Sequence, residues 1–203
     1  SQYNSNVRYY EFNVTQRSIN PDCSDHVSPV FLINNQMPGP KITAVQGDVV
    51  RVLIRNQLSP MPKKDDHRHN VAIHFHGIRQ YGSVHSDGVP YLTQMPIKPG
   101  QEFMHEFRIV NQAGTYFYHA HVGLQEETVF GPIVVYESKH ADPENNNANT
   151  SSLLKAGPYT YHDERTLLLS EWWHRPHMEF EKFLMGPKFN FIPEADSILI
   201  NGH

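Results

Sequence analysis

Cysteine is almost absent from this sequence, since Cys23 is the only one among 203 residues. Cys23 therefore has no disulfide partner within these residues. In a secreted protein a leftover cysteine indicates a partner elsewhere, and the alternative is a small buried side chain without a partner. Both expectations stand at this point, and the first predicts a disulfide bond to another polypeptide.

Basic clusters and long apolar runs are missing as well. The formal net charge is −4 and no block of lysine and arginine interrupts the sequence, so nucleic acid finds no basic surface to contact. No apolar run approaches the roughly 20 residues that a membrane-spanning helix needs. We therefore expect no nucleic-acid partner and no membrane span.

Histidine, proline and aromatic residues are abundant. The chain has 14 histidines, and neutral histidine is the commonest metal ligand. Its 15 prolines, 10 tyrosines and 11 phenylalanines, arranged in short apolar runs, are typical of an all-β chain with many turns. The expected strands cover residues 7–19, 29–34, 41–45, 49–56, 71–76, 101–110, 115–121 and 131–137. Strands of this length and spacing predict a β-sandwich or a Greek-key barrel.

A change in composition after residue 139 predicts a domain boundary. Residues 140–155 are polar and poor in apolar side chains, as in a linker. We expect a first domain over residues 1–139 and the beginning of a second over residues 156–203. So short a segment cannot close a second sandwich, so the sequence is expected to stop inside that domain. The elements expected there are strands at 165–170 and 197–200 and a short helix at 177–185.

Two His-x-His pairs carry the chemistry of the sequence: His74 with His76, and His119 with His121. Residues two apart on a strand point the same way and lie about 6.6 Å apart, and neighbouring strands are about 4.8 Å apart. If the two strands are neighbours, four imidazoles meet in one patch. Four imidazoles without a thiolate suit copper, zinc, iron or nickel.

The side chains beside these pairs are expected to form the apolar support of the site. We predict that Phe75, Phe117 and Tyr118 point away from the imidazoles and fill the core, which holds ligands rigidly and excludes water. The other histidines considered are expected to be structural or solvated: His67 and His69 in a charged loop, His105 in the core or at an edge, and His174 and His177 in packing contacts.

The two histidine motifs resemble the first two copper motifs of the multicopper oxidases, the family of laccases, ascorbate oxidases and ferroxidases. The motifs are His74-Phe75-His76-Gly77 and Gly-Thr-Tyr-Phe-Tyr-His-Ala-His at residues 114–121. Further segments similar to the family follow in order along nearly the whole chain: residues 34–42, 47–48, 87–88, 94–100, 130–135, 171–174 and 198–202.

The resemblance implies a cupredoxin fold and a trinuclear copper cluster at which dioxygen is reduced to water with electrons from a separate type 1 copper. It implies that His74 is a ligand of the type 2 copper. It also implies that the type 3 pair is held by His76, His119 and His121. Asp87 matches an acidic residue that lies near the cluster and helps to deliver protons, which suits a carboxylate because making water takes up protons.

The remaining polypeptide of such an enzyme is the expected partner. The family's cluster takes more histidines than these four, and Cys23 is not in the context of a type 1 ligand, so the other copper motifs are expected outside this sequence. The sequence also departs from the family pattern in three places. His85 replaces a usual Trp, Met95 replaces a Cys found in many laccases, and residues 125–129 differ from the common approach to Gly131-Pro132.

The expected function is that of the N-terminal part of a secreted laccase-like multicopper oxidase, with dioxygen and a phenolic or similar small-molecule reductant as substrates. The start of the sequence, Ser-Gln-Tyr-Asn without Met, fits a processed secreted protein or merely a trimmed sequence. Asn13 and Asn149 begin glycosylation sequons, which are acceptors only if the protein is secreted.

Two alternatives remain open. The first is a non-enzymatic copper-binding or electron-transfer cupredoxin, although such a copper site needs a cysteine near a histidine at a spacing that is missing here. The second is a mononuclear zinc or iron enzyme on another β fold. Its facial triad would combine two histidines with one carboxylate. The candidates for that triad are His74, His76 and either Asp87 or Glu106.

Overall fold

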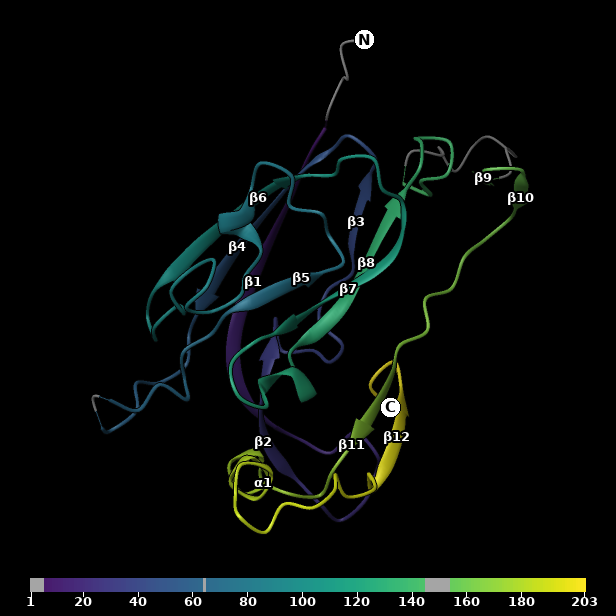
Figure 1. The fold of residues 1–203 in the computed structure, drawn as a ribbon. Helices are drawn as coiled ribbons and strands as arrows, with labels where there is room; N and C mark the ends of the chain where they lie inside the picture. The colour runs from purple at the N-terminus through teal and green to yellow at the C-terminus, as the bar shows by residue number, and fades with distance from the viewer. Residues whose placement is uncertain (1–5, 64, 145–153) are drawn as a thin grey trace.

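The computed structural model describes residues 6–63, 65–144 and 154–203. Regular structure in these residues is almost entirely β-strand, as the composition predicts (Figure 1). The strands are β1 (Val7–Ile19), β2 (Ser28–Ile33), β3 (Ile42–Val45), β4 (Val49–Asn56), β5 (Ile73–His76), β6 (Glu102–Arg108), β7 (Gly114–Ala120), β8 (Phe130–Tyr136), β9 (Leu154–Ala156), β10 (Tyr159–Tyr161), β11 (Leu169–Trp172) and β12 (Ser197–Ile200). The helical segments are η1 (Val84–Ser86), η2 (Gln125–Glu127) and α1 (His177–Leu184). Within the described residues no helix has the length and apolar character needed to cross a membrane.

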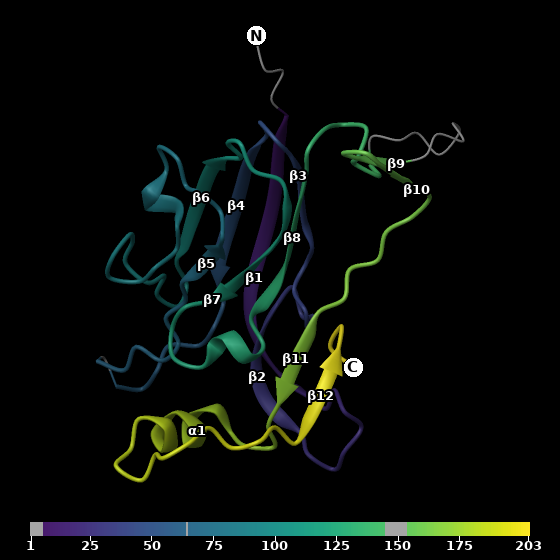
Figure 2. The same cartoon turned by 45° about the vertical axis from the view of Figure 1, so that its right-hand side comes forward.

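Two four-stranded sheets face each other in the larger part of the molecule (Figures 1 and 2). Their strand orders are β2-β1-β4-β6 and β3-β8-β7-β5. Each sheet has one parallel pair, β1 with β4 and β3 with β8, and its other neighbouring strands run antiparallel. The arrangement is a cupredoxin-like β-sandwich, which confirms the expected all-β class.

Alternating side chains of the two sheets fill the space between them. In β6, His105 and Phe107 are buried whereas Glu106 and Arg108 are exposed, as expected for a strand with one face on a core. The largest fully buried side chains come from both sheets and from the C-terminal segment: Tyr118, Phe12, Phe75, Phe107, Ile33, Ile42, Ile54, Ile73, Ile109, Ile133, Leu199 and His105.

Tyr118 of β7 explains two of the glycines in the segments that resemble the multicopper oxidases. Its hydroxyl is buried and donates a hydrogen bond to the carbonyl oxygen of Pro40 at 2.8 Å. A Cβ atom on Gly39 would lie 2.4 Å from this hydroxyl oxygen, and one on Gly131 would lie 2.2 Å from it. Glycine at both positions therefore leaves room for the Tyr118 ring between the backbones of residues 39 and 131, on the core side of the strand that also carries His119.

The C-terminal part of the chain lies against one end of the sandwich (Figure 2). β11 and β12 pair antiparallel, and Trp172 and Leu199 pack against Val30 and Leu32 of β2. A Cβ atom on Gly202 would lie 2.1 Å from the carbonyl oxygen of Met37, so the end of this segment approaches the sandwich backbone closely. The helix and the last strand confirm the expected elements there.

One expected strand lies elsewhere. Residues 165–170 were expected to be extended because of the run Leu167-Leu168-Leu169, but β11 covers residues 169–172. Leu167 and Leu169 are 72 and 70 % exposed, whereas Trp172 is 2 % exposed and anchors the strand. Packing of the tryptophan, rather than the leucine run, thus sets the position of the strand.

The expected linker is described only in part. Residues 145–153, including the sequon at Asn149, lie outside the described residues. The last residues of the expected linker begin a short hairpin, β9 with β10, that the sequence did not indicate.

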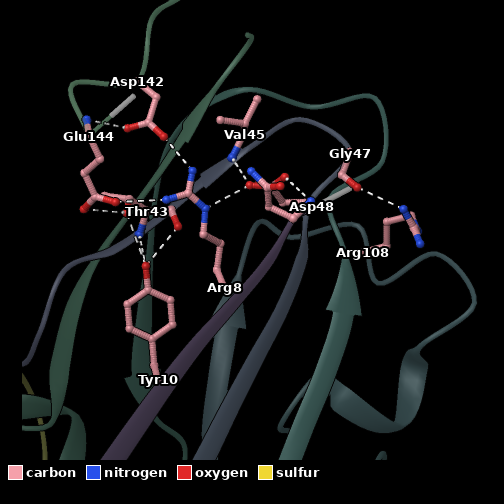
Figure 3. A network of polar contacts seen from close by, with 10 residues as sticks. Arg8, Tyr10, Thr43, Val45, Gly47, Asp48, Arg108, Asp142 and Glu144 are labelled. Carbon is pink, nitrogen blue, oxygen red and sulfur yellow. Dashed lines mark hydrogen bonds and ion pairs between the residues drawn. The ribbon is translucent and has the colours of Figure 1, made fainter. Parts of the chain in front are cut away.

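Arg8, near the start of β1, joins three segments through carboxylates (Figure 3). Its guanidinium nitrogens lie 3.0 Å from Oδ2 of Asp48, 2.6 Å from Oδ2 of Asp142 and 2.9 Å from Oε2 of Glu144. Desolvation alone would lower the pKa of Arg8, but its hydrogen bonds to Asp142 and Asp48 outweigh desolvation and raise the pKa above its ordinary value. This Arg8 clamp fixes the point where the chain leaves β8.

Replacing Arg8 by Met should remove the cation that the buried carboxylates of Asp48 and Asp142 contact. Breaking a buried ion pair in this way costs about 3–5 kcal/mol, so the free energy of unfolding in urea should fall by roughly that amount. Arg108→Met is the matched control, because Arg108 donates to the carbonyl of Gly47 at an exposed site and should cost less than about 1 kcal/mol. Equal losses in the two variants would contradict the clamp.

Candidate metal centre

The antiparallel pairing of β5 with β7 brings the two histidine motifs together. In this register His74 lies opposite His119. The ring centroids of His74 and His119 are 5.6 Å apart, as are those of His76 and His119. One ring nitrogen from each of these three residues lies within 4.8 Å of the other two. The expected neighbouring strands are therefore present, and they bring three imidazoles together around one point.

His121 adjoins this group without belonging to it. It follows the last residue of β7, and its backbone N–H donates to the carbonyl of Ala72 at 2.8 Å. Its ring centroid lies 5.8 Å from that of His119 and 5.9 Å from that of His74. The exposed His121 ring thus lies at the edge of the three-histidine group.

His74 is held in one orientation by the loop that follows its strand. Its Nδ1 donates to the backbone carbonyl of Asp87 at 2.7 Å, which leaves Nε2 as the free nitrogen. Desolvation lowers the pKa of His74, and the neutral imidazole is the form that binds metals. A Cβ atom on Gly88 would lie 1.8 Å from the carbonyl oxygen of Ile73. Glycine at this position therefore allows the Asp87 carbonyl to reach His74.

Asp87 lies beside the group, as the resemblance implies, but its carboxylate is not one of the grouped ligands. Its Oδ1 is 3.4 Å from Nδ1 of His74, and its side chain is 25 % exposed. The carboxylate therefore faces the supporting side of the imidazole and retains a path to solvent. Its role in proton delivery stays a prediction.

His76 and His119 face each other with their nitrogens at the spacing of two ligands of one ion. Nδ1 of His76 lies 3.4 Å from Nε2 of His119. Two imidazole nitrogens bound to one ion at about 2.0–2.1 Å in tetrahedral geometry lie roughly 3.3 Å apart. The donor set, which is all imidazole nitrogen, fits copper.

Glu126 of η2 supports the other ring nitrogen of His119. Its Oε2 lies 3.3 Å from Nδ1 of His119, and the carbonyl of Ala120 lies 2.9 Å from the same nitrogen. The hydrogen bond to Glu126 raises the pKa of His119. A carboxylate on the far nitrogen fixes the tautomer of a ligating imidazole and raises its basicity. The sequence reasoning missed Glu126, whose only signal was the unusual segment 125–129.

Phe117 does not point into the core, so that prediction is wrong. Residues 117, 119 and 121 share the parity of one strand face, and Phe117 is 44 % exposed. Its ring stacks on His76 at 4.7 Å and lies 5.3 Å from the ring of His119. Phe75 and Tyr118, in contrast, are fully buried as predicted. Phe117 therefore covers the imidazoles from outside.

The other histidines considered in the sequence lie outside this group. His105 is fully buried, which confirms its place in the core. His67 is exposed, and Nδ1 of His69 lies 2.7 Å from the carbonyl of Ser59. His174 and His177 were expected to make packing contacts only, but each also contacts a carboxylate. His174 lies 2.6 Å from Asp22, and His177 lies 2.9 Å from Glu127.

Cys23 is exposed, which contradicts the alternative of a small buried side chain. The expectation that it pairs with a cysteine of another polypeptide stays a prediction.

The fold and the site together define a cupredoxin-type metal protein whose imidazoles suit copper. A family model described as multicopper oxidase matches residues 13–140, and a second model with the same description matches residues 163–203. The chain belongs to the multicopper oxidase family, and members of this family bind copper in a trinuclear cluster.

Curated relatives agree with this assignment. The chain is 36% identical over 197 residues to an L-ascorbate oxidase of Cucumis sativus, covering 97% of this chain and 29% of the relative. It is 35% identical over 205 residues to Laccase-22 of Oryza sativa subsp. japonica, covering 97% of this chain and 30% of the relative. The chain thus spans about 30% of the length of these relatives.

Solved structures are similar over almost the whole chain. Fet3p, a multicopper oxidase that functions in iron import, superposes with a TM-score of 0.77 at 29% identity, covering 97% of this chain and 33% of that one. A laccase from Botrytis aclada superposes with a TM-score of 0.70 at 30% identity, covering 98% and 31%.

Replacing Glu126 by Gln should weaken the support of His119. The pKa of His119 in the metal-free protein, raised by Glu126 in the native chain, should fall towards its ordinary value, as an NMR pH titration of the ring would show. Copper affinity, measured by competition at a pH where the imidazoles are neutral, should fall about 10- to 100-fold. Glu127→Gln is the control, since Glu127 pairs with His177 instead. An unchanged pKa and affinity in E126Q would refute the supporting role.

Proposed function

We propose that this chain is the N-terminal part of a laccase-like multicopper oxidase. The whole enzyme oxidises phenolic or similar reductants one electron at a time and reduces dioxygen to water. The observation that carries the proposal is the group of three imidazole nitrogens, within 4.8 Å of one another, on the paired strands of a cupredoxin-like sandwich. Both family-model matches and the similarity to laccases support it.

The chain would supply half of the cluster's histidines. His74 would hold the type 2 copper, and the type 3 pair would be held by His76, His119 and His121. Bound copper supplies the one-electron redox chemistry and the site of dioxygen reduction. The residues of this chain orient and shield it: the Asp87 carbonyl fixes His74, Glu126 fixes His119, and Phe117 covers His76.

Protons for water formation would pass through Asp87. Its carboxylate lies 3.4 Å from the His74 ring and is 25 % exposed, so it can take a proton from solvent and hold it at the edge of the site. A carboxylate is suited to this role because it can accept a proton and release it again.

The missing ligands would come from the remaining polypeptide. One face of the β11–β12 pair is uncovered, with Ile198 and Ile200 64 and 53 % exposed. A cleft of about 740 Å³ separates this pair from the histidine group, and His76 and His119 form part of its wall. Exposed apolar area of this kind marks a surface that another part of a protein covers. We infer that the first cupredoxin domain covers residues 1–139, a linker covers residues 140–155, and residues 156–203 are the beginning of a second cupredoxin domain.

The choice of reductant and the location of the enzyme extend the same proposal. Ascorbate is the reductant that the name of the similar ascorbate oxidases gives, and phenols are the reductants that the resemblance to laccases implies. We further propose that the enzyme is secreted, which is consistent with the sequon at Asn13 and with the exposed Cys23 as a partner for a cysteine elsewhere.

The mononuclear alternative is weaker for geometric reasons. Glu106 lies on β6 in the other sheet and pairs with Arg51 at 2.6 Å, so it cannot complete a triad with His74. Asp87 faces the Nδ1 side of His74, where the Asp87 backbone carbonyl already accepts the ring proton.

Removing one ligand tests the proposal on the intact enzyme. His119→Ala should lose cluster copper, counted by elemental analysis against native mass, and oxygen consumption with a phenol should fall more than about 100-fold, because even supporting residues of a metal site are worth 10–100-fold. His67→Ala, in an exposed position on the loop before β5, should retain both. A wild-type enzyme with a single copper and no oxygen consumption would favour the electron-transfer alternative and overturn the proposal.

A further inference from the structure

His105 is a polar ring buried completely in the apolar interior of the sandwich. It lies on β6, between the rings of Phe75 and Phe103, whose centroids are 5.0 and 4.7 Å away. Burial lowers its pKa to about 4, so the ring is neutral at neutral pH and carries one N–H. A polar ring in hydrocarbon is unfavourable unless its polar atoms make hydrogen bonds, so its one hydrogen bond is informative.

That hydrogen bond runs to the loop that supports the metal centre. Nδ1 of His105 lies 3.0 Å from the carbonyl oxygen of Ser86, the last residue of η1. A carbonyl only accepts, so the proton of His105 is on Nδ1. Its Nε2 has no hydrogen-bond partner within the part of the chain that the structure describes. A phenylalanine would fill this space without an unpaired nitrogen, so the donor to Ser86 is what distinguishes histidine here.

Ser86 is itself held from two sides. It is fully buried, and its Oγ accepts a hydrogen bond from the backbone N–H of Glu106 at 3.0 Å. Its carbonyl also accepts from Nε2 of Gln80, at the longer distance of 3.3 Å. Two adjacent residues of β6 therefore donate hydrogen bonds to the two oxygen atoms of Ser86: His105 to its carbonyl oxygen and Glu106 to its Oγ. This double contact fixes η1 against the sandwich.

The residue after Ser86 is the one that orients His74. The carbonyl of Asp87 accepts from Nδ1 of His74 at 2.7 Å and from the backbone N–H of Phe75 at 3.3 Å. Gly88 then lies against the backbone of β5, with no room for a side chain. A displacement of Ser86 would thus move the acceptor that determines which nitrogen of His74 carries the proton.

We propose that His105 is a positioning residue for His74. Its hydrogen bond to Ser86 holds the Asp87 carbonyl in place, and the carbonyl keeps the proton on Nδ1 of His74 and presents Nε2 to the metal. The proposal rests on the proposed function only for the identity of that metal, copper. His105 itself is not proposed to contact the metal. It acts on His74 through Ser86 and Asp87.

Two substitutions in the intact enzyme separate the hydrogen bond from the ring. His105→Phe keeps the aromatic volume and removes the donor, and His105→Met serves the same purpose if the phenyl ring does not fit. His105→Asn retains a donor, because the side-chain amide nitrogen of Asn occupies the place of Nδ1. Phe103→Leu is the control, since Phe103 packs on the same ring but makes no hydrogen bond to η1.

The readouts are the tautomer of His74 in the metal-free enzyme, from the ¹⁵N shifts of its ring, and the affinity for added Cu(II). H105F should shift His74 from a single Nδ1–H form to a mixture and weaken Cu(II) binding about 10-fold, while H105N should restore both. If H105F resembles F103L in both readouts, or if H105N fails to restore the tautomer, the proposal is wrong. A shifted tautomer in an enzyme that binds no copper would leave the positioning role intact and overturn the proposed function instead.

Discussion

The pairing of β5 with β7 is the constraint on which the site depends. It sets His74 opposite His119 and leaves Nδ1 of His76 3.4 Å from Nε2 of His119. β5 has only four residues and lies at the edge of its sheet. Its register therefore depends on its pairing with β7 and on the packing of side chains in the core. Phe75 and Tyr118 bury their rings beneath the two strands. A slip of one residue would send both imidazoles of β5 into the core and Phe75 out to solvent.

The loops after the two ligand strands complete the site in matching ways. η1 leads to a backbone carbonyl on Nδ1 of His74, and η2 brings a carboxylate to Nδ1 of His119. Both contacts act on the nitrogen that faces away from the group, so the opposite nitrogens are presented together. The first support is neutral and partly buried, whereas the second is charged and half exposed. The two imidazoles also differ in basicity: desolvation lowers the pKa of His74, whereas the hydrogen bond to Glu126 raises that of His119.

Much of this structure follows from the sequence because alternation along a strand is a strong signal. The approximate strand ranges around both histidine pairs, the buried face of β6 and the meeting of three of the four imidazoles could be derived from it, whereas the ligand roles remain predictions. Phe117 was misplaced although the same rule puts it on the histidine face. Glu126 and the link from His105 to Asp87 could not be found, because they depend on how loops fold back in space. The range of β11 was predicted too early in the sequence, because exposed leucines such as Leu167 cannot be told from buried ones by their composition.

Anomalous diffraction from crystals of the intact enzyme, collected on both sides of the copper absorption edge, tests the central claim most directly. The account predicts copper peaks about 2.0–2.1 Å from Nε2 of His74 and from the facing nitrogens of His76 and His119, with the remaining ligands drawn from polypeptide outside this chain. Imidazoles without a copper peak, or a single peak whose signal appears at the zinc or iron edge, would contradict it.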